Sequence, residues 1–323
     1  MRKLFLLIFL IFASLAGAEE EKKELKFGIY ITNLYDINFA KNEYTVQFWS
    51  WFHHDNKEYK PNSSIEIMNA KKFTREAANE EVVNGINWDT SKIKATINQE
   101  WEIRHFPFDT QKFTIVVEDI DMDAEALVLV PDKQASKIDP KAIPDGWTLK
   151  KFEMNTHVNS YATAFGDPSS MTNTKQDFSR LSVDIYLQRD GWRLFFTTFI
   201  GFFVATSLLL IAFIVLSIPS AVSTVQQQPR ITLIIGALFS TIGSVYGLSS
   251  KLPYTTQFTL ADSLEITTFT GVALAAIGSI SYDVFVKNKK HKQALILNRV
   301  MFIIFLTLSF GLNAYMILNA LHS

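Results

Sequence analysis

The sequence predicts an all-β sandwich in the first half of the chain and an all-α bundle of four transmembrane helices in the second half. Short runs with strand character occupy the first half, whereas four long apolar segments follow Asp190. The charges divide in the same way. Residues 19–190 contain 29 acidic and 21 basic side chains, a net charge of −8, and residues 191–323 contain 3 acidic and 8 basic side chains, a net charge of +5. This contrast indicates two domains in different surroundings.

The chain begins with the pattern of a cleavable signal peptide, which we expect at residues 1–18. Arg2 and Lys3 precede a largely apolar run at residues 4–15, and small residues follow at 16–18. The alternative is an uncleaved membrane anchor, but an apolar run of this length is short for a membrane span. The mature protein would then begin at Glu19.

Residues 19–190 have the patterns of an antiparallel, immunoglobulin-like β-sandwich. Alternating apolar residues at Leu181, Val183, Ile185 and Leu187 are typical of a strand with one buried face. Other strand-like runs lie at 27–31, 44–52, 113–117 and 127–130, and proline or glycine residues separate them. The 323 residues include no cysteine, so we expect packing alone to stabilise this exported domain.

Four apolar segments predict a transmembrane domain at residues 191–323, with helices at about 192–218, 230–250, 260–286 and 293–321. An even number of spans places both ends of the mature chain on one side of the membrane. Basic residues cluster between the third and fourth segments, at Lys287, Lys289, Lys290, Lys292 and Arg299. This cluster predicts a cytoplasmic loop and therefore an N-terminal domain outside the cell membrane.

The second apolar segment, residues 231–250, has the length of a membrane span but carries six serine and threonine side chains. Hydroxyls that recur along a helix are poor contacts for lipid, so the segment predicts a helix with one face on water, as in a pore. Residues three or four apart share a face, which here carries Thr232, Gly236, Phe239, Gly243, Tyr246 and Ser250. The alternative is that Phe239 and the glycines pack against a neighbouring helix.

Residues 99–113, centred on Phe-Pro-Phe-Asp at 106–109, resemble the signature loop of the pentameric ligand-gated ion channels, the Cys-loop receptor superfamily. In animal members two cysteines close this loop. Gln99 and Phe113 stand at those positions here, which is similar to the bacterial members. Residues 230–233 resemble the start of the pore-lining helix, and Leu-Pro-Tyr-Thr-Thr at 252–256 resembles the following loop of the amine-gated bacterial members.

The resemblance implies a homopentamer, in which each chain assembles with four identical subunits, and a ligand-gated ion channel of a bacterial inner membrane. It also implies that the second helix lines the pore. Phe239, with glycines on either side, is then the expected constriction, which would block ions by dewetting, and Tyr246 forms a second, outer ring.

Two features of the sequence make opposite predictions about ion selectivity. Residues 217–228 lack the carboxylate that cation-selective members carry at the inner mouth, and a proline before Arg230 is similar to the anion-selective relatives. The exterior net charge of −8 favours cations in the vestibule. We expect inorganic cations to permeate.

The resemblance further implies a ligand site between adjacent subunits. The matching positions are Trp49, Glu66, Glu118, Asp119, Ile120, Phe165 and Phe178. Cations stack on aromatic faces and pair with carboxylates, so a small amine is the expected agonist. A proton is the alternative, because crowded carboxylates raise one another's pKa. Calcium held by Asp119, Asp121 and Asp123 is a weaker candidate, and a solvated acidic turn is the simplest interpretation of these residues.

The coupling between the ligand site and the pore is expected at the seam between the domains. The resemblance places Asp36, Phe108, Asp109, Arg189, Lys251 and Pro253 there. Asp109 and Arg189 have opposite charges, and an ion pair shielded at this junction would hold the two domains in register.

Two other functions are compatible with parts of the sequence. A membrane receptor of the same fold that conducts nothing would result if the aromatic rings sealed the pore. A four-span membrane enzyme has no support from a nucleophile elbow, a phosphate loop or a cluster of metal ligands, so we expect neither catalysis nor a cofactor. The acidic exterior domain also disfavours nucleic-acid binding.

Overall fold

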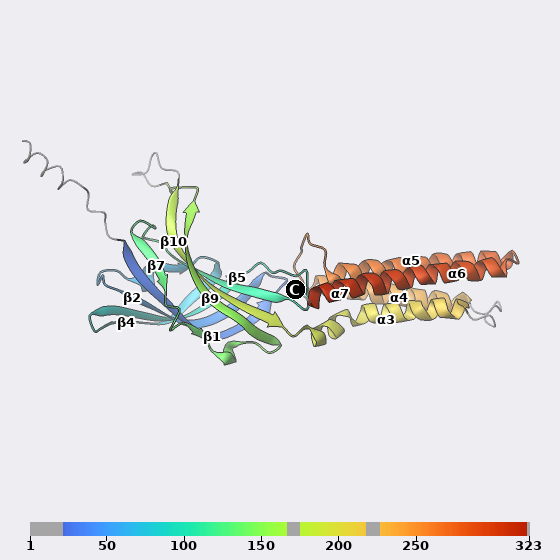
Figure 1. Cartoon of the computed structure of the whole chain (residues 1–323), viewed down its shortest axis with the longest axis horizontal. Helices are drawn as coiled ribbons and strands as arrows, with labels where there is room; N and C mark the ends of the chain where they lie inside the picture. The colour runs from blue at the N-terminus through green and yellow to red at the C-terminus, as the bar shows by residue number, and fades with distance from the viewer. Residues whose placement is uncertain (1–21, 167–174, 218–226, 322–323) are drawn as a thin grey trace, which may run out of the picture.

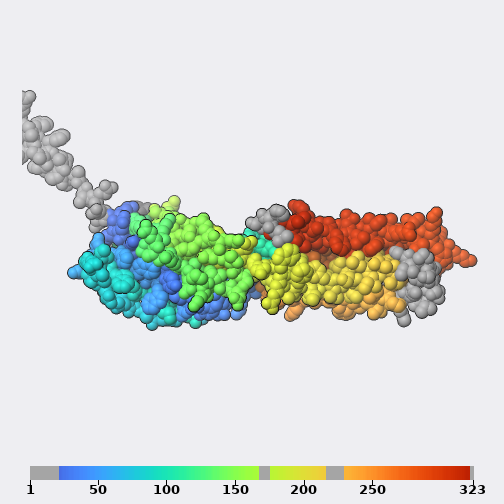
Figure 2. Space-filling model, turned by 60° about the horizontal axis from the view of Figure 1, so that its bottom comes forward, coloured from blue at the N-terminus to red at the C-terminus, as the bar shows by residue number. Residues whose placement is uncertain are grey.

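The computed structural model describes residues 22–166, 175–217 and 227–321. The expected signal peptide lies outside these residues. A β domain and a helical bundle lie end to end along the long axis of the molecule (Figures 1 and 2). The β domain has two sheets, and four helices are long and apolar enough to cross a membrane. The two-part fold class predicted from the sequence is therefore confirmed for one chain.

The larger sheet contains, in spatial order, β4 (Ala70–Val83), β5 (Ile86–Asn98), β2 (Glu43–His54), β1 (Lys23–Asn38) and β7 (Leu127–Pro131), and the short β8 (Lys137–Ile138) also pairs with β1. The smaller sheet contains β3 (Ile65–Ile67), β6 (Thr110–Asp119), β10 (Gln176–Arg189) and β9 (Trp147–Tyr161). Most pairs are antiparallel, as expected. However, β7 and β8 run parallel to β1, because residues 120–126 carry the chain from the smaller sheet across to the larger one.

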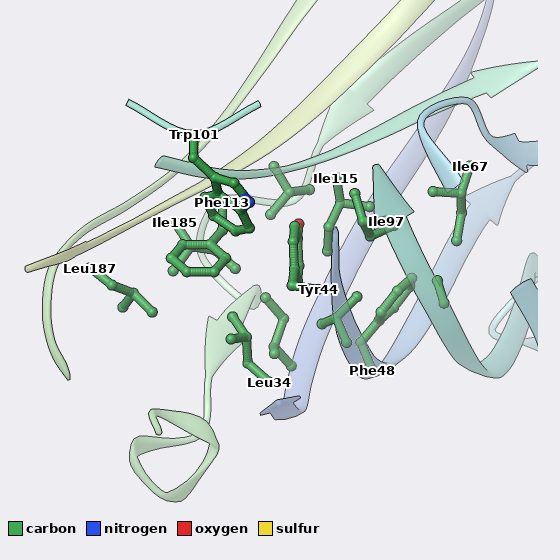
Figure 3. Packing of buried hydrophobic residues seen from close by; sticks show 14 of the residues in the cluster. Leu34, Tyr44, Phe48, Ile67, Ile97, Trp101, Phe113, Ile115, Ile185 and Leu187 are labelled. Carbon is green, nitrogen blue, oxygen red and sulfur yellow. The ribbon is translucent and has the colours of Figure 1, made fainter. Parts of the chain in front are cut away.

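Alternate residues of the strands fill the core between the two sheets (Figure 3). The four apolar residues that alternate along β10 are all fully buried, as the sequence pattern predicts. Tyr44 lies near the middle of this core, with its ring 5.0 Å from the ring of Phe113. Its hydroxyl donates a hydrogen bond of 2.9 Å to the carbonyl of Thr114, and burial raises the pKa of Tyr44 well above its ordinary value. Tyr44 therefore stays neutral, and its buried hydroxyl has a hydrogen-bond partner.

The loop at residues 99–113 is closed by side-chain contacts at its two ends. The fully buried ring of Phe113 meets the ring of Trp101 at 5.2 Å, and Trp101 stacks on Phe39 at 4.6 Å. The side-chain oxygen of Gln99 accepts a hydrogen bond of 3.2 Å from the backbone of Thr114. Aromatic packing of this kind contributes about 0.5–1.5 kcal/mol per ring pair beyond the area buried.

The helical bundle contains α3 (Gly191–Ser217), α4 (Gln227–Ser249), α5 (Leu260–Lys287) and α6 (His291–Leu306). The last of these continues through a π-helical turn, Thr307–Leu312, into α7 (Asn313–Leu321). At the start of α5, Thr259 and Asp262 form a capping box, which satisfies backbone amides that the first turn of a helix leaves free. Near the π-helical turn, Ser263 donates a hydrogen bond of 2.7 Å to Asn313, which ties α5 to α7.

Gly201 allows α3 and α4 to pack closely. The hydroxyl of Ser240 donates a hydrogen bond of 2.8 Å to the Gly201 carbonyl. A Cβ atom at position 201 would lie 1.9 Å from the hydroxyl oxygen of Ser244 and 3.2 Å from the carbonyl oxygen of Ser240. Any side chain at this position therefore requires Ser244 to rotate and the two helices to separate.

The Gly201→Ala substitution is expected to lower the melting temperature of the detergent-solubilised protein. Overpacking of a tight contact costs about 1–3 kcal/mol. Gly243→Ala is the matched control, because a Cβ at position 243 meets nothing within 4 Å in the chain. Melting temperatures that fall equally for both variants would show that the close α3–α4 contact does not determine the stability of the protein.

Candidate functional site

The predicted pore-facing side of α4 is the side that the rest of the chain leaves uncovered. Phe239 is 70% exposed and Tyr246 is 79% exposed, and Thr232, Gly243 and Ser250 are exposed too. Gly236 is half-buried. The opposite side of the helix packs inside the bundle and consists of Arg230, Ile234, Ala237, Thr241 and Leu248. One chain therefore presents two aromatic rings, glycine backbone and hydroxyls on a single continuous face.

Gly243 and Gly247, the two glycines beside Tyr246, make no close packing contact within the chain, whereas a Cβ atom at Gly236 would lie 3.4 Å from Leu208 of α3. A Cβ atom built at Gly243 or Gly247 meets nothing within 4 Å, in contrast to Gly201, where α3 and α4 are in direct contact. The alternative that Phe239, Gly243 and Gly247 form a helix-packing motif is therefore not realised inside one subunit. Their small size leaves open space beside the phenyl and phenol rings.

The candidate ligand site is centred on Glu118, on the outer face of the smaller sheet. Glu118 on β6 lies directly opposite Glu66 on β3 and Arg180 on β10. One of its carboxylate oxygens accepts a hydrogen bond of 2.8 Å from Nε of Arg180, and the other accepts one of 2.7 Å from the Tyr161 hydroxyl. Arg180 in turn donates a hydrogen bond of 2.7 Å to the Tyr161 oxygen. We call Glu118, Tyr161 and Arg180 the Glu118 triangle.

The Glu118 triangle is shielded from solvent by its own members. Glu118 is only 3% exposed although it points outward from the sheet. Burial, followed by the hydrogen bond to Glu118, raises the pKa of Tyr161, so the phenol stays neutral and donates to the carboxylate. Because the guanidinium compensates the carboxylate, a cationic ligand can reach Glu118 only by displacing Arg180.

Two further aromatic residues border the triangle. The ring of Tyr161 lies 5.4 Å from the ring of Phe165 and 5.7 Å from the ring of Phe178, both in edge-to-face geometry. Phe165 is 64% exposed, at the start of the expected capping loop, whose residues 167–174 lie outside the described residues. The structure thus brings together Glu66, Glu118, Phe165 and Phe178, four of the residues that the sequence predicts for the site. It adds Tyr161 and Arg180.

Asp119 does not face this site. It follows Glu118 on the strand and points into the sandwich, where it accepts hydrogen bonds from the hydroxyls of Tyr59 and Ser64, the latter at 2.7 Å. Burial and the bond to Asp119 raise the pKa of Tyr59 far above its ordinary value. Asp119 also accepts backbone hydrogen bonds of 2.8 Å from Asp121 and Met122. Its oxygens therefore stabilise the crossover at residues 120–126.

The fold does not form the calcium site that was a weaker candidate for Asp119, Asp121 and Asp123. Asp123 uses its carboxylate to accept backbone hydrogen bonds of 3.0 Å from Glu125 and Ala126. Across the three described ranges, no group of three or more acidic, histidine or cysteine side chains could hold a metal ion. The acidic segment 119–126 is thus organised by turns in which carboxylates cap backbone amides.

Among the predicted ligand residues, Glu66 is the cross-strand neighbour of Glu118, whereas Trp49 lies apart. Glu66 is exposed on β3, and Ile120 is exposed just after β6. Trp49 is 40% exposed and belongs to β2 of the larger sheet, where Tyr30 and Lys92 are its cross-strand neighbours. One chain therefore does not place Trp49 beside Glu118, because the two residues belong to different sheets.

At the seam between the domains, Asp109 and Arg189 form the ion pair that their charges predict. Nε of Arg189 lies 2.9 Å from one Asp109 oxygen, and the second guanidinium contact measures 3.3 Å. The guanidinium also lies over the rings of Trp147, Phe39 and Phe106, at 4.3, 4.5 and 5.1 Å. Burial lowers the pKa of Arg189, and Asp109 opposes that shift. Because three aromatic rings surround the guanidinium, the Asp109–Arg189 ion pair is buried.

The signature loop also contacts the first transmembrane helix directly. The ring of Phe108 lies 4.9 Å from Trp192 on α3, and a Cβ atom at Gly191 would lie 2.2 Å from the Pro107 carbonyl oxygen. Asp36 and Lys251 are both exposed, and no ion pair joins either one to a described residue across the seam. Phe108, Asp109 and Arg189 thus all make contacts at this seam.

A cavity of about 560 Å³ lies where the segment after α4 meets the signature loop. Pro253 lines it together with Ile103 of the loop and Glu265 of α5. Gln257 reaches across the seam and donates a long hydrogen bond of 3.4 Å to Glu102. Pro253 thus belongs to a second contact between the domains, separate from the Asp109–Arg189 pair.

Comparison with known proteins adds no family assignment: no protein-family model matches the chain, and no curated protein matches it. The uncovered face of α4, the Glu118 triangle and the buried pair at the seam are therefore the features from which a function can be inferred.

Proposed function

We propose that the chain is the subunit of a homopentameric, ligand-gated ion channel of the Cys-loop receptor superfamily, located in the inner membrane of a bacterium. The uncovered face of α4 carries this proposal. Five copies around an axis would enclose Phe239 and Tyr246 in a central pore and bury the flanks of α4 between subunits. The basic residues after α5 support a cytoplasmic position for that end of the bundle and an exterior position for the β domain, because basic loops favour the cytoplasmic side.

In the proposed assembly, Phe239 is the gate. Five phenyl rings at one level form an apolar constriction, and the space beside each glycine makes the rings the narrowest part of the pore. Such a constriction excludes water and stops ions without being sterically closed. Tyr246, about two helical turns further out, forms a wider ring with hydroxyl groups.

The proposed agonist is a small amine bound between two subunits. One subunit supplies Glu66, Ile120, Phe165 and Phe178, and its neighbour supplies Trp49. The exposed carboxylate of Glu66 and the aromatic faces are the groups that attract a cation. Because Arg180 already compensates Glu118, an amine that competes for this carboxylate releases Arg180 and loosens the β9–β10 end of the sheet. A proton is the second candidate agonist, because carboxylates that crowd together favour proton uptake.

Current through purified protein in planar bilayers tests the proposal. Primary amines and solutions of decreasing pH would be applied separately to the side of the β domain. Agonist-dependent current supports the channel, and the effective agonist identifies which of the two acts on the site. Binding without current under all conditions would favour the alternative, a non-conducting membrane receptor of the same fold.

The Glu118→Gln substitution is expected to shift the agonist response. It keeps the shape of the side chain but removes the charge that holds Arg180, so the amine concentration for half-maximal current should change by about tenfold or more. Glu153→Gln is the matched control, since Glu153 lies on the outer face of the same sheet but pairs with the exposed Lys151. An unaltered amine response in Glu118→Gln would exclude this site.

The non-conducting receptor is favoured by one observation, the presence of two aromatic residues on the α4 face. Two stacked rings of five aromatic side chains would seal a narrow pore more tightly than one ring. Substitution of Tyr246 by Ser separates the two functions: a channel should remain agonist-dependent and conduct more, whereas a receptor should stay silent.

A further inference from the structure

The only formally charged residue of α4 is Arg230, and it lies on the packed side of the helix. Arg230 is two residues before Thr232, a rotation of roughly 200° around the helix axis. It continues the row formed by Ile234, Ala237 and Thr241, all of them buried. The guanidinium therefore points away from the exposed face that carries Phe239.

Arg230 is held there by the last turns of α5. Its Nη2 atom lies 3.0 Å from a carboxylate oxygen of Asp283, and its guanidinium lies 5.3 Å from the centre of the Tyr282 ring. The side chain of Arg230 is 5% exposed, and that of Asp283 is 18% exposed. Charge, hydrogen bonding and a cation–π contact all oppose rotation of Arg230 toward the exposed face.

The start of α4 and the end of α5 lie at the end of the bundle that is far from the β domain (Figure 1). Arg230 is in the first turn of α4, and Asp283 is four residues from the end of α5. This end also carries the exposed basic residues Lys287, Lys289 and Lys290. In a pentamer, the inner mouth would therefore be ringed by five guanidinium groups, each of them paired behind the pore wall.

We propose that the Arg230–Asp283 pair determines charge selectivity, by keeping the inner mouth of the pore free of net positive charge. This inference rests on the proposed channel function. With Arg230 compensated, the α4 wall presents only hydroxyls, backbone and aromatic faces. The electronegative faces of five Phe239 and five Tyr246 side chains and the acidic exterior domain then favour cations. An uncompensated ring of five guanidinium groups would favour anions instead.

Reversal potentials in asymmetric sodium chloride test the proposal. In Asp283→Asn, Arg230 loses its carboxylate, and the chloride-to-sodium permeability ratio should rise roughly tenfold, since a ring of like charge enriches its counter-ion. Arg299→Gln is the control for a change of exposed charge at the same end of the bundle, and its reversal potential should equal that of the wild type.

A double variant, Arg230→Gln with Asp283→Asn, keeps the test informative if Asp283→Asn does not assemble. It leaves no buried charge without a partner, and its reversal potential should match that of the wild type because the pair as a whole is neutral. A clear shift toward cation permeation in the double variant would show that Arg230 acts on the pore in spite of Asp283, which overturns the proposal.

The outcomes separate this inference from the channel itself. A wild type without current under any agonist overturns the proposed function and this inference with it. Agonist-gated current with the same reversal potential in the wild type and in Asp283→Asn overturns only the role of the pair.

Discussion

Replacement of Phe239 by alanine is expected to produce channels that open at lower agonist concentration and conduct in its absence. The phenyl ring is the largest apolar group on the uncovered face of α4, and its removal widens and wets the constriction. A tenfold lower half-maximal agonist concentration corresponds to about 1.4 kcal/mol in favour of the open state. Current before and after agonist addition in planar bilayers measures both effects.

Two comparisons make this experiment specific to the gate. Phe239 is 70% exposed in the chain, so the substitution should alter the melting temperature of the protein far less than a core truncation such as Phe213→Ala. Ile242→Ala removes an exposed apolar side chain from the flank of the same helix face and should leave the basal current unchanged. A Phe239→Ala channel as silent as the wild type, with the same agonist dependence, would contradict the assignment of the gate.

Removal of the charge on Asp109 is expected to cause the largest loss of stability. Asp109→Asn leaves the guanidinium of Arg189 buried among three aromatic rings without its carboxylate. Breaking one partner of a buried pair costs about 3–5 kcal/mol, and this cost includes the unpaired charge that remains. The melting temperature of the solubilised protein should fall sharply, and agonist should open the remaining folded channels less effectively.

The matched control is an exposed ion pair of the same domain. Lys71 and Glu43 are 2.9 Å apart, with side chains 38% and 24% exposed. Such a pair contributes about 0–1 kcal/mol because solvent screens it. Glu43→Gln should therefore leave the melting temperature almost unchanged. Equal effects of Asp109→Asn and Glu43→Gln would mean that the seam does not depend on its buried pair.

The parts of the structure that follow from local patterns could be predicted from the sequence. Period-two alternation identified the buried face of β10, and helical spacing identified the exposed face of α4. The Asp109–Arg189 pair could be predicted because the resemblance placed two opposite charges at one seam.

The rest of the candidate site depends on strand register and on contacts between distant segments. Tyr161 reaches Glu118 only because β9 pairs with β10 in one particular register across a long connection. Asp283 meets Arg230 through the packing of α4 against α5, although the two residues are 53 positions apart in the chain. The resemblance places Asp119 among the ligand residues, but the strand turns its side chain inward. Residue type alone does not tell whether a side chain on a strand points into the sandwich or out to the solvent.

Because Trp101, Phe113 and Gln99 close the loop at residues 99–113 without a disulfide, its contact with α3 does not depend on oxidation state. Thiol reductants, which open the corresponding loop in proteins closed by a disulfide, have no bond to break in these 323 residues. Channel activity should therefore be the same in reducing and oxidising buffers. Single cysteines can also be introduced along the exposed face of α4 as reporters, with no native thiol to compete for the label.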